Sequence, residues 1–313
     1  MRLVLPLLLS VAIPTLAIAQ TSPAAAPRAA APPAAQAAEG AKLRRLFEES
    51  NEAALRRNPI EAISRGDLRY ANRLGDYYTR AYDEAERQAL VDDLNALRKI
   101  DRSKLGTVDR IAYDVFESDR ARDLKAFDPA LRRISDVLPI NHFRGFQTFY
   151  PEFASGQGAA PFKTTEDYDN NLKRNAQYAA LVDRMIVRAR EGMAQGIMPP
   201  RLVVQNVIGQ LDNLLAPSVE ESLFYEPVTK FPDAVRAADR TRLTAAYAKQ
   251  VRDVLNPAHQ RLRAFLQQEY LPKARDTIGT SALPGGAAYY DYLIESNTTL
   301  PLKAEEVHQL GLR

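Results

Sequence analysis

Three histidines are the first side chains to consider, because imidazole binds metal ions and transfers protons near neutral pH. They are His142, His259 and His308, and none lies four residues from another. A mononuclear catalytic zinc needs about three protein ligands that converge on one point. Glu305 and His308 have the i, i+3 spacing of one helical face, but di-iron bundles built on this spacing need a second such pair. The sequence lacks that second pair, so we expect no metal site and no bound cofactor in this chain.

Each histidine has a plainer interpretation. His308 falls in a short segment that predicts a surface helix closed by Gly311. His259 follows a proline in a charged helical segment, and we expect it to be exposed. His142 lies among aromatic residues, where a hydrogen-bonded structural imidazole is favoured over a catalytic base.

Nucleophile and phosphate-binding motifs are incomplete. The chain has no cysteine. The segment 279–283 lacks the second glycine of a nucleophile elbow, and Gly156 and Gly158 lack the strand and lysine of a phosphate-binding loop. Adjacent acidic pairs diverge on a helix and indicate solvated faces. We therefore assign no catalytic residue.

The strongest candidate for binding is a glycine-rich turn followed by tyrosines. Gly285 and Gly286 allow a positive φ angle or a close approach of the backbone to a ligand. Tyr289 and Tyr290 follow, and a phenol can donate a hydrogen bond to a developing oxyanion. These four residues are the predicted substrate-binding set. The alternative is a loop that joins two helices and half buries its tyrosines, and residue types alone favour it.

The elements that must position these residues are helical. Apolar residues recur at helical spacing in five segments, including a longest segment that Thr164 or Thr165 starts and Gly196 ends. Pro257 should kink or divide the last long segment, 241–270. Residues 135–153 form the exception, which we interpret as an ordered aromatic loop. The residues expected to face inward are Leu43, Leu46, Phe47, Ala54, Leu55, Leu90, Leu94, Leu97, Ile100, Ile111, Val115, Phe116, Leu124, Tyr168, Leu172, Leu181, Met185, Val203, Val207, Leu211 and Leu214.

The N-terminal residues predict export. An uncharged apolar run from Leu3 to Ile18 ends in a small-x-small pattern that is typical of a cleaved signal peptide, residues 1–19. Residues 20–38 are rich in Ala and Pro and predict a flexible linker, and residues 39–313 a helical domain of one or two lobes. Without cysteine, neither a disulfide nor a lipid-bearing cysteine is expected. The predicted location is therefore periplasmic or secreted, with no membrane contact after cleavage.

The charge pattern argues against nucleic acid as a partner. The formal net charge is +3 among 42 basic and 39 acidic residues. Both signs alternate along the chain, whereas nucleic-acid binding needs a concentrated basic patch.

Several motifs together resemble one protein family. They are Leu-Pro-Gly-Gly at 283–286, Tyr-Tyr at 289–290, Thr-Thr at 298–299 and Glu-Glu-Val-His-Gln-Leu-Gly at 305–311. Upstream, Asn58-Pro59 with residues 66–70, and residues 168–174 with 192–200, agree. Over about residues 40–313 the chain resembles the bacterial domain-of-unknown-function family number 885.

That resemblance implies a fold and a function. Such proteins look like all-α zinc peptidases of the thimet oligopeptidase and neurolysin type, whose His-Glu-x-x-His motif lies beyond residue 313. The chain would then be an N-terminal portion, incomplete at its C-terminus. It would form one wall of a peptide-binding cleft and be inactive alone, with the remaining portion as its partner. The alternative is a non-enzymatic periplasmic helical binding or scaffold protein.

Overall fold

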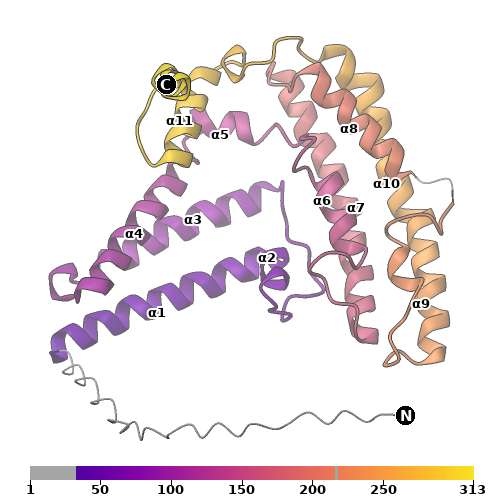
Figure 1. Cartoon of the computed structure of the whole chain (residues 1–313), viewed down its shortest axis with the longest axis horizontal. Coiled ribbons are helices and arrows are strands. Elements are labelled where there is room, and N and C mark those ends of the chain that lie inside the picture. Colours follow the sequence, from indigo (N-terminus) through magenta and orange to yellow (C-terminus); the bar gives the residue numbers. More distant parts are fainter. Residues whose placement is uncertain (1–32, 216–217) are drawn as a thin grey trace, which may run out of the picture.

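The computed structural model describes residues 33–215 and 218–313. These residues form helices joined by loops, with no strand among them (Figure 1). The all-α fold class predicted from helical spacing is confirmed. The predicted signal peptide lies outside the described residues. Helix α1 begins at Ala34, so the end of the predicted linker, residues 34–38, is helical.

Three helices form an arm on one side of the molecule. They are α1 (Ala34–Arg57), α3 (Arg80–Leu97) and α4 (Thr107–Lys125), which pack side by side (Figure 1). The inward positions predicted for the first two helices are confirmed. The buried cluster of the arm consists of Leu43, Leu46, Leu97, Ile100, Leu105 and Tyr113.

Helix α4 turns inward only part of the predicted set, because Phe116 packs against the arm cluster and two other predicted residues do not. Tyr113 is 7% exposed, whereas Ile111 and Val115 are 60% and 54% exposed. The rings of Phe47 and Phe116 also meet, with centroids 4.9 Å apart. The prediction for Ile111 and Val115 is wrong because α4 carries apolar residues on two sides, and only the side with Tyr113 meets α1 and α3.

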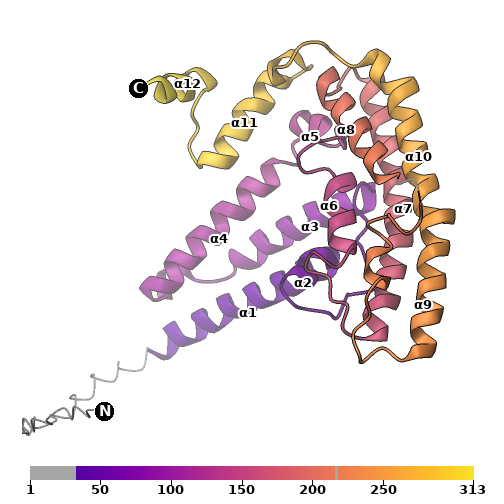
Figure 2. The ribbon, with the colours of Figure 1, turned by 45° about the vertical axis from the view of Figure 1, so that its right-hand side comes forward.

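A bundle on the other side contains the main core. Its helices are α6 (Phe146–Ala154), α7 (Thr165–Ala194), α8 (Arg201–Leu214), α9 (Ala237–Gln250) and α10 (Asn256–Phe265), as Figure 2 shows. α7 is central and contacts α6, α9 and α10. The core residues that α7 and α8 supply include Tyr178, Leu181, Val182, Met185, Val204, Val207, Ile208 and Leu211.

The predicted ends of α7 are confirmed. The hydroxyl of Thr164 accepts a hydrogen bond from the backbone N–H of Asp167 at 3.3 Å, and the Asp167 carboxylate accepts one from the N–H of Thr164 at 2.8 Å. This capping box satisfies amides that the helix leaves free. At the other end Gly196 adopts a φ of 68°, a conformation that glycine reaches without strain.

Pro257 does not divide the last long helix. The five-residue π-helical turn η3 (Val251–Leu255) precedes it, and a second, η4 (Leu266–Tyr270), precedes Pro272. Proline removes an amide donor and crowds the carbonyl of the preceding turn. The wider π turn relieves that crowding, so α9, η3 and α10 follow one another without a break.

The aromatic segment 135–153, predicted as a loop, is partly helical. Helix α5 (Pro129–Ser135) ends where it begins, and α6 occupies its second half. Phe146, Tyr150 and Phe153 have the i, i+4, i+7 spacing of one helical face. Tyr150 and Phe153 are buried against α7. Burial of these rings outweighs the helix-breaking tendency of Pro151.

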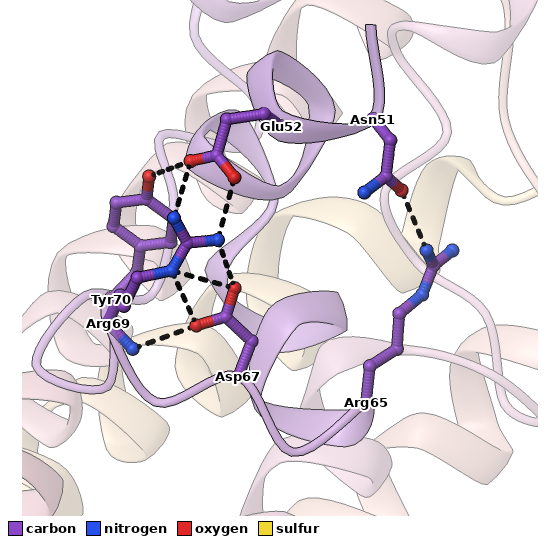
Figure 3. A network of polar contacts seen from close by, with 6 residues as sticks. All are labelled: Asn51, Glu52, Arg65, Asp67, Arg69 and Tyr70. Atoms are coloured by element: carbon purple, nitrogen blue, oxygen red, sulfur yellow. Dashed lines mark hydrogen bonds and ion pairs between the residues drawn. The ribbon is translucent and has the colours of Figure 1, made fainter. Parts of the chain in front are cut away.

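A polar network fixes the loop after α2 (Pro59–Ser64) to α1 (Figure 3). Arg69 Nη2 donates to Glu52 at 2.7 Å and to Asp67 at 2.6 Å, and the Tyr70 hydroxyl donates to Glu52 at 2.6 Å. Arg69 is 58% exposed, so solvent screens these pairs and each contributes little to stability. They orient the loop more than they stabilise the fold.

The C-terminal helices α11 (Gly286–Thr298) and α12 (Ala304–Leu312) lead away from the bundle (Figure 2). α12 buries none of its residues. His308 is exposed, as predicted, but Gly311 lies inside α12 and does not close it. The remaining short helices are of the 3-10 type, namely η1 (Arg102–Lys104), η2 (Glu226–Val228), η5 (Leu271–Lys273) and η6 (Thr280–Ala282).

Candidate functional site

One pocket brings together the glycine-rich turn and the aromatic segment. It has a volume of about 340 Å³, and we call it the α8–α11 pocket. Three pieces of chain form it: the segment from Ser135 to Phe143, the start of α8, and the connection that leads into α11. Its lining residues are Ser135, Leu138, Ile140, Asn141, His142, Phe143, Pro199, Pro200, Val203, Arg275, Thr280, Leu283 and Tyr289.

Of the four predicted binding residues, Tyr289 lines this pocket. Its side chain is half-buried, and burial, together with the neighbouring Tyr292, raises the pKa of its phenol. The phenol therefore stays protonated at neutral pH and can donate a hydrogen bond. Tyr290 is 44% exposed and does not line the pocket.

The two glycines serve the turn itself. Gly285 adopts a φ of 78° and precedes the first turn of α11. A Cβ atom on Gly286 would lie 1.8 Å from the backbone oxygen of Thr280. Gly286 thus lets α11 approach η6, which lies at the edge of the pocket. The glycines shape the pocket by allowing this close packing, and their contact with a substrate stays a prediction.

The segment 141–143 supplies another part of the lining. The side-chain oxygen of Asn141 accepts hydrogen bonds from the N–H groups of Phe143 at 2.8 Å and Arg144 at 3.0 Å. Gln210 on α8 donates to the backbone oxygen of His142 at 2.7 Å. The His142 imidazole lies against the Phe143 ring, with centroids 4.0 Å apart and the planes tilted by 41°, and it makes no hydrogen bond with the described residues. The expected hydrogen-bonded imidazole is therefore not found.

Arg275 supplies the positive charge of the pocket. Its Nε donates to the backbone oxygen of Met198 at 2.8 Å, and its Nη1 to those of Thr277 at 2.6 Å and Gly279 at 2.8 Å. Burial lowers the pKa of the guanidinium, which still remains charged at neutral pH. Among residues 33–215 and 218–313, no carboxylate pairs with it.

A second pocket, of about 260 Å³, adjoins the first at Ser135. Its charges are already compensated. Arg132 pairs with both Asp83 and Asp136, and Arg188 pairs with Glu191 at 2.8 Å. Burial raises the pKa of Asp136. This pocket therefore offers a ligand little unpaired charge.

The histidines do not converge. His259, predicted to be exposed, is fully buried; its ring nitrogen Nε2 lies 3.0 Å from the Tyr178 hydroxyl. That prediction was wrong because the charged residues of this helix lie on its outer face. In the part of the chain that the structure describes, no three His, Cys, Asp or Glu residues are placed to hold a metal ion.

Sequence reasoning missed Arg275 and gave Val203 a different role. Nothing in the local sequence distinguishes Arg275 from the many other arginines, because its position depends on the bridge that residues 200 and 275 form across the fold. Val203 was assigned to the buried face of α8 and instead lines the pocket. The bends at 141–143 and 275–285 bring these residues together.

Comparison with known proteins gives a family and a fold. The sequence model of a family described as "Bacterial protein of unknown function (DUF885)" matches residues 59–313. The fold is similar to the crystal structure of a "putative lipoprotein" from Colwellia psychrerythraea, with a TM-score of 0.74 and 19% sequence identity. The similarity covers 88% of this chain and 48% of that protein, so the chain spans about half its length. None of the curated proteins matches the chain. In the described part, no helix is both long and apolar enough to cross a membrane.

Proposed function

Because the chain belongs to the bacterial DUF885 family, we propose that it is the N-terminal portion of an exported zinc-metallopeptidase-like protein. In this proposal it forms one wall of a peptide-binding cleft. The α8–α11 pocket carries the proposal, because its lining combines Tyr289, Asn141 and His142 with several apolar side chains. Pockets that bind organic ligands combine an apolar lining with a few convergent polar groups in this way.

Exposed apolar surface supports a larger assembly. On α4, Val108 is 78% exposed beside Ile111 and Val115. On α12, Leu310 and Leu312 are 57% and 68% exposed. Contiguous exposed apolar surface is typical of an interface. We assign these faces to contact with the remaining, C-terminal portion of the same fold.

The chemistry of hydrolysis belongs to that remaining portion in this proposal. A catalytic zinc polarises the scissile carbonyl and activates a water molecule. The described residues do not form a ligand set for it, so we assign them no step of bond cleavage. Their role is to bind and orient the peptide. Export rests on the predicted signal peptide at residues 1–19, and the periplasm or the medium is the proposed location.

The test begins with the coding DNA downstream of Arg313. The proposal expects an in-frame continuation that encodes a His-Glu-x-x-His motif. The longer protein should hydrolyse a mixture of unstructured peptides, as followed by mass spectrometry, whereas residues 39–313 alone should not. A longer protein whose motif glutamate is replaced by glutamine serves as the control for contaminating peptidases.

The contrary outcome has its own signature. A stop codon after Arg313, with cooperative unfolding of the chain alone, would favour the non-enzymatic binding or scaffold protein. One tightly bound zinc per chain, found by atomic absorption after dialysis of residues 39–313, would contradict the assignment of the metal to the remaining portion.

A further inference from the structure

We infer that the α8–α11 pocket binds the C-terminal residue of a peptide, with the carboxylate on Arg275 and an apolar side chain among the apolar lining residues. This inference deepens the proposed function and rests on it. It also fixes the direction in which the peptide binds, because the C-terminal end must enter the pocket.

Arg275 is held in place but keeps a free donor. Its Nε and Nη1 donate to the backbone oxygens of Met198, Thr277 and Gly279. Its Nη2 makes no hydrogen bond with the described residues and is not among their buried polar atoms without a partner. An arginine fixed by carbonyl groups loses little freedom when it binds a carboxylate. Nη2 is therefore a preorganised donor for an anion.

The surroundings of Arg275 favour a negative ligand. None of the lining residues is Asp or Glu. The neighbouring Asp276 is directed to Arg201, with Nε and Oδ1 2.8 Å apart. The pocket also includes Pro199 and Pro200 at the start of α8, where the helix dipole contributes partial positive charge. The absence of acidic lining residues and the dipole of α8 both favour a negatively charged ligand.

The apolar part of the lining favours an apolar side chain. Leu138, Ile140, Val203 and Leu283 line the pocket together with the two prolines. A volume of about 340 Å³ lies near the lower end of the range of about 300–1,000 Å³ that is usual for small-molecule sites. It suits one terminal residue with part of the preceding one. Tyr289 and Thr280 can meet the peptide backbone.

Two other places in the molecule show why Arg275 is distinctive. Arg174 also lacks a carboxylate partner among the described residues, but it is 1% exposed and its guanidinium bonds to the Ala71 oxygen and to Asn171. No ligand can reach it. Arg132 faces a pocket, but Asp83 and Asp136 already pair with it. Arg275 alone among these three combines access with an unpaired charge.

The test is calorimetric titration of residues 20–313, the predicted mature chain with all of α1, with N-acetyl-Ala-Ala-Leu. The same tripeptide as its C-terminal amide and hexanoate are the comparison ligands. Charge-assisted hydrogen bonds are about twice as strong as neutral ones, and we expect the acid to bind at least about tenfold more tightly than the amide. It should also bind more tightly than hexanoate, which has the carboxylate and an alkyl chain but no peptide groups.

Two variants with a matched control locate the site. Arg275→Gln should abolish the preference for the acid, but it also removes bonds that hold residues 277–279. Val203→Asp leaves Arg275 intact and adds a carboxylate to the pocket, and it should weaken binding of the acid at least about tenfold. Leu202→Asp, on the neighbouring residue that is 64% exposed and outside the pocket, should leave binding unchanged.

The outcomes separate the inference from the proposed function. Equal binding of acid and amide, lost in Val203→Asp, would overturn the carboxylate assignment and retain peptide binding. Hexanoate binding as tightly as the tripeptide would overturn the peptide C-terminus as the ligand. Loss of binding in Leu202→Asp as strong as in Val203→Asp would overturn the location.

Discussion

The hydroxyl of Tyr178 and Nε2 of His259 lie 3.0 Å apart and join α7 to α10 inside the main core. Both residues are fully buried. The ring of Phe224 stacks against the imidazole, with centroids 5.7 Å apart. Burial lowers the pKa of His259 to about 4, so the imidazole is neutral at physiological pH. The core therefore contains a group that resists protonation.

His259 should make the fold sensitive to mild acid. Its pKa lies below the ordinary value of 6.5 in the folded chain, so the unfolded chain binds a proton first as the pH falls. This contribution to stability is complete above pH 6.5 and is lost progressively towards pH 4. The loss in unfolding free energy amounts to about 3 kcal/mol, because each pKa unit between the unfolded and the folded value corresponds to about 1.4 kcal/mol. Urea unfolding of residues 39–313 across this range measures it.

Two variants isolate the effect from the titration of carboxylates. His259→Gln should reduce the decrease in unfolding free energy between pH 6.5 and 4 by most of that amount. His308→Gln, at an exposed position of α12, should keep the decrease of the unmodified chain. The assignment fails if both variants show the same pH dependence.

The close packing at Gly286 predicts a severe effect of one methyl group. Gly286→Ala places Cβ 1.8 Å from the Thr280 oxygen and should cost about 3 kcal/mol of stability, at the upper end for overpacking. Gly209 is exposed in the interior of α8, and nothing lies within 4 Å of an added Cβ. Gly209→Ala should therefore stabilise the chain by about 1 kcal/mol. Thermal unfolding of both variants provides the comparison, and a stable Gly286→Ala chain would contradict the geometry of the turn.

The capping box of α7 predicts that the Thr164 hydroxyl contributes measurably to the free energy of unfolding. Thr164→Ala removes the acceptor for the Asp167 N–H and should cost about 1 kcal/mol, which is typical of a lost N-cap. Thr164→Ser retains the oxygen and should restore most of the stability. Equal unfolding free energies for the alanine and serine variants would exclude a capping role.

The two faces of α4 predict opposite responses to truncation. Tyr113→Ala opens a cavity in the arm and should destabilise residues 39–313 by about 3 kcal/mol. Ile111→Ala, on the exposed face, should change the stability by less than about 0.5 kcal/mol. Urea unfolding distinguishes the two. A larger loss for Ile111→Ala would restore the orientation that the sequence predicted.

Several helices could be predicted because their sequences have apolar residues at helical spacing and residues that are typical of helix ends. Leu43 and Leu46 recur at helical spacing before Asn58, and Thr164 and Gly196 frame α7. In these cases local signals and tertiary packing agree. Capping residues predicted both ends of α7 correctly. The helix end predicted at Gly311 was wrong, because α12 continues to Leu312.

The errors arose where local signals support two solutions. α4 has an apolar stripe through Ile111 and a second side with Tyr113, and only contact with α1 and α3 selects between them. His259 shares a helix with many charges, and its burial depends on Tyr178 and Phe224, which are distant in sequence. The pocket is the same kind of case: Tyr289 could be proposed from its motif, whereas Arg275 reaches the pocket only through the fold.

The π turns before Pro257 and Pro272 also govern how this helix tolerates length changes. Each residue of a regular α-helix advances the azimuth by about 100°. A π turn bonds over one more residue than an α turn and winds by less per residue, so η3 accommodates one residue more than a regular turn would. Deletion of one residue between Val251 and Leu255, with Pro257→Ala to permit regular winding, would leave His259 and Leu262 facing the interior. Single-residue deletions in η3 should therefore be better tolerated than single-residue deletions in α10.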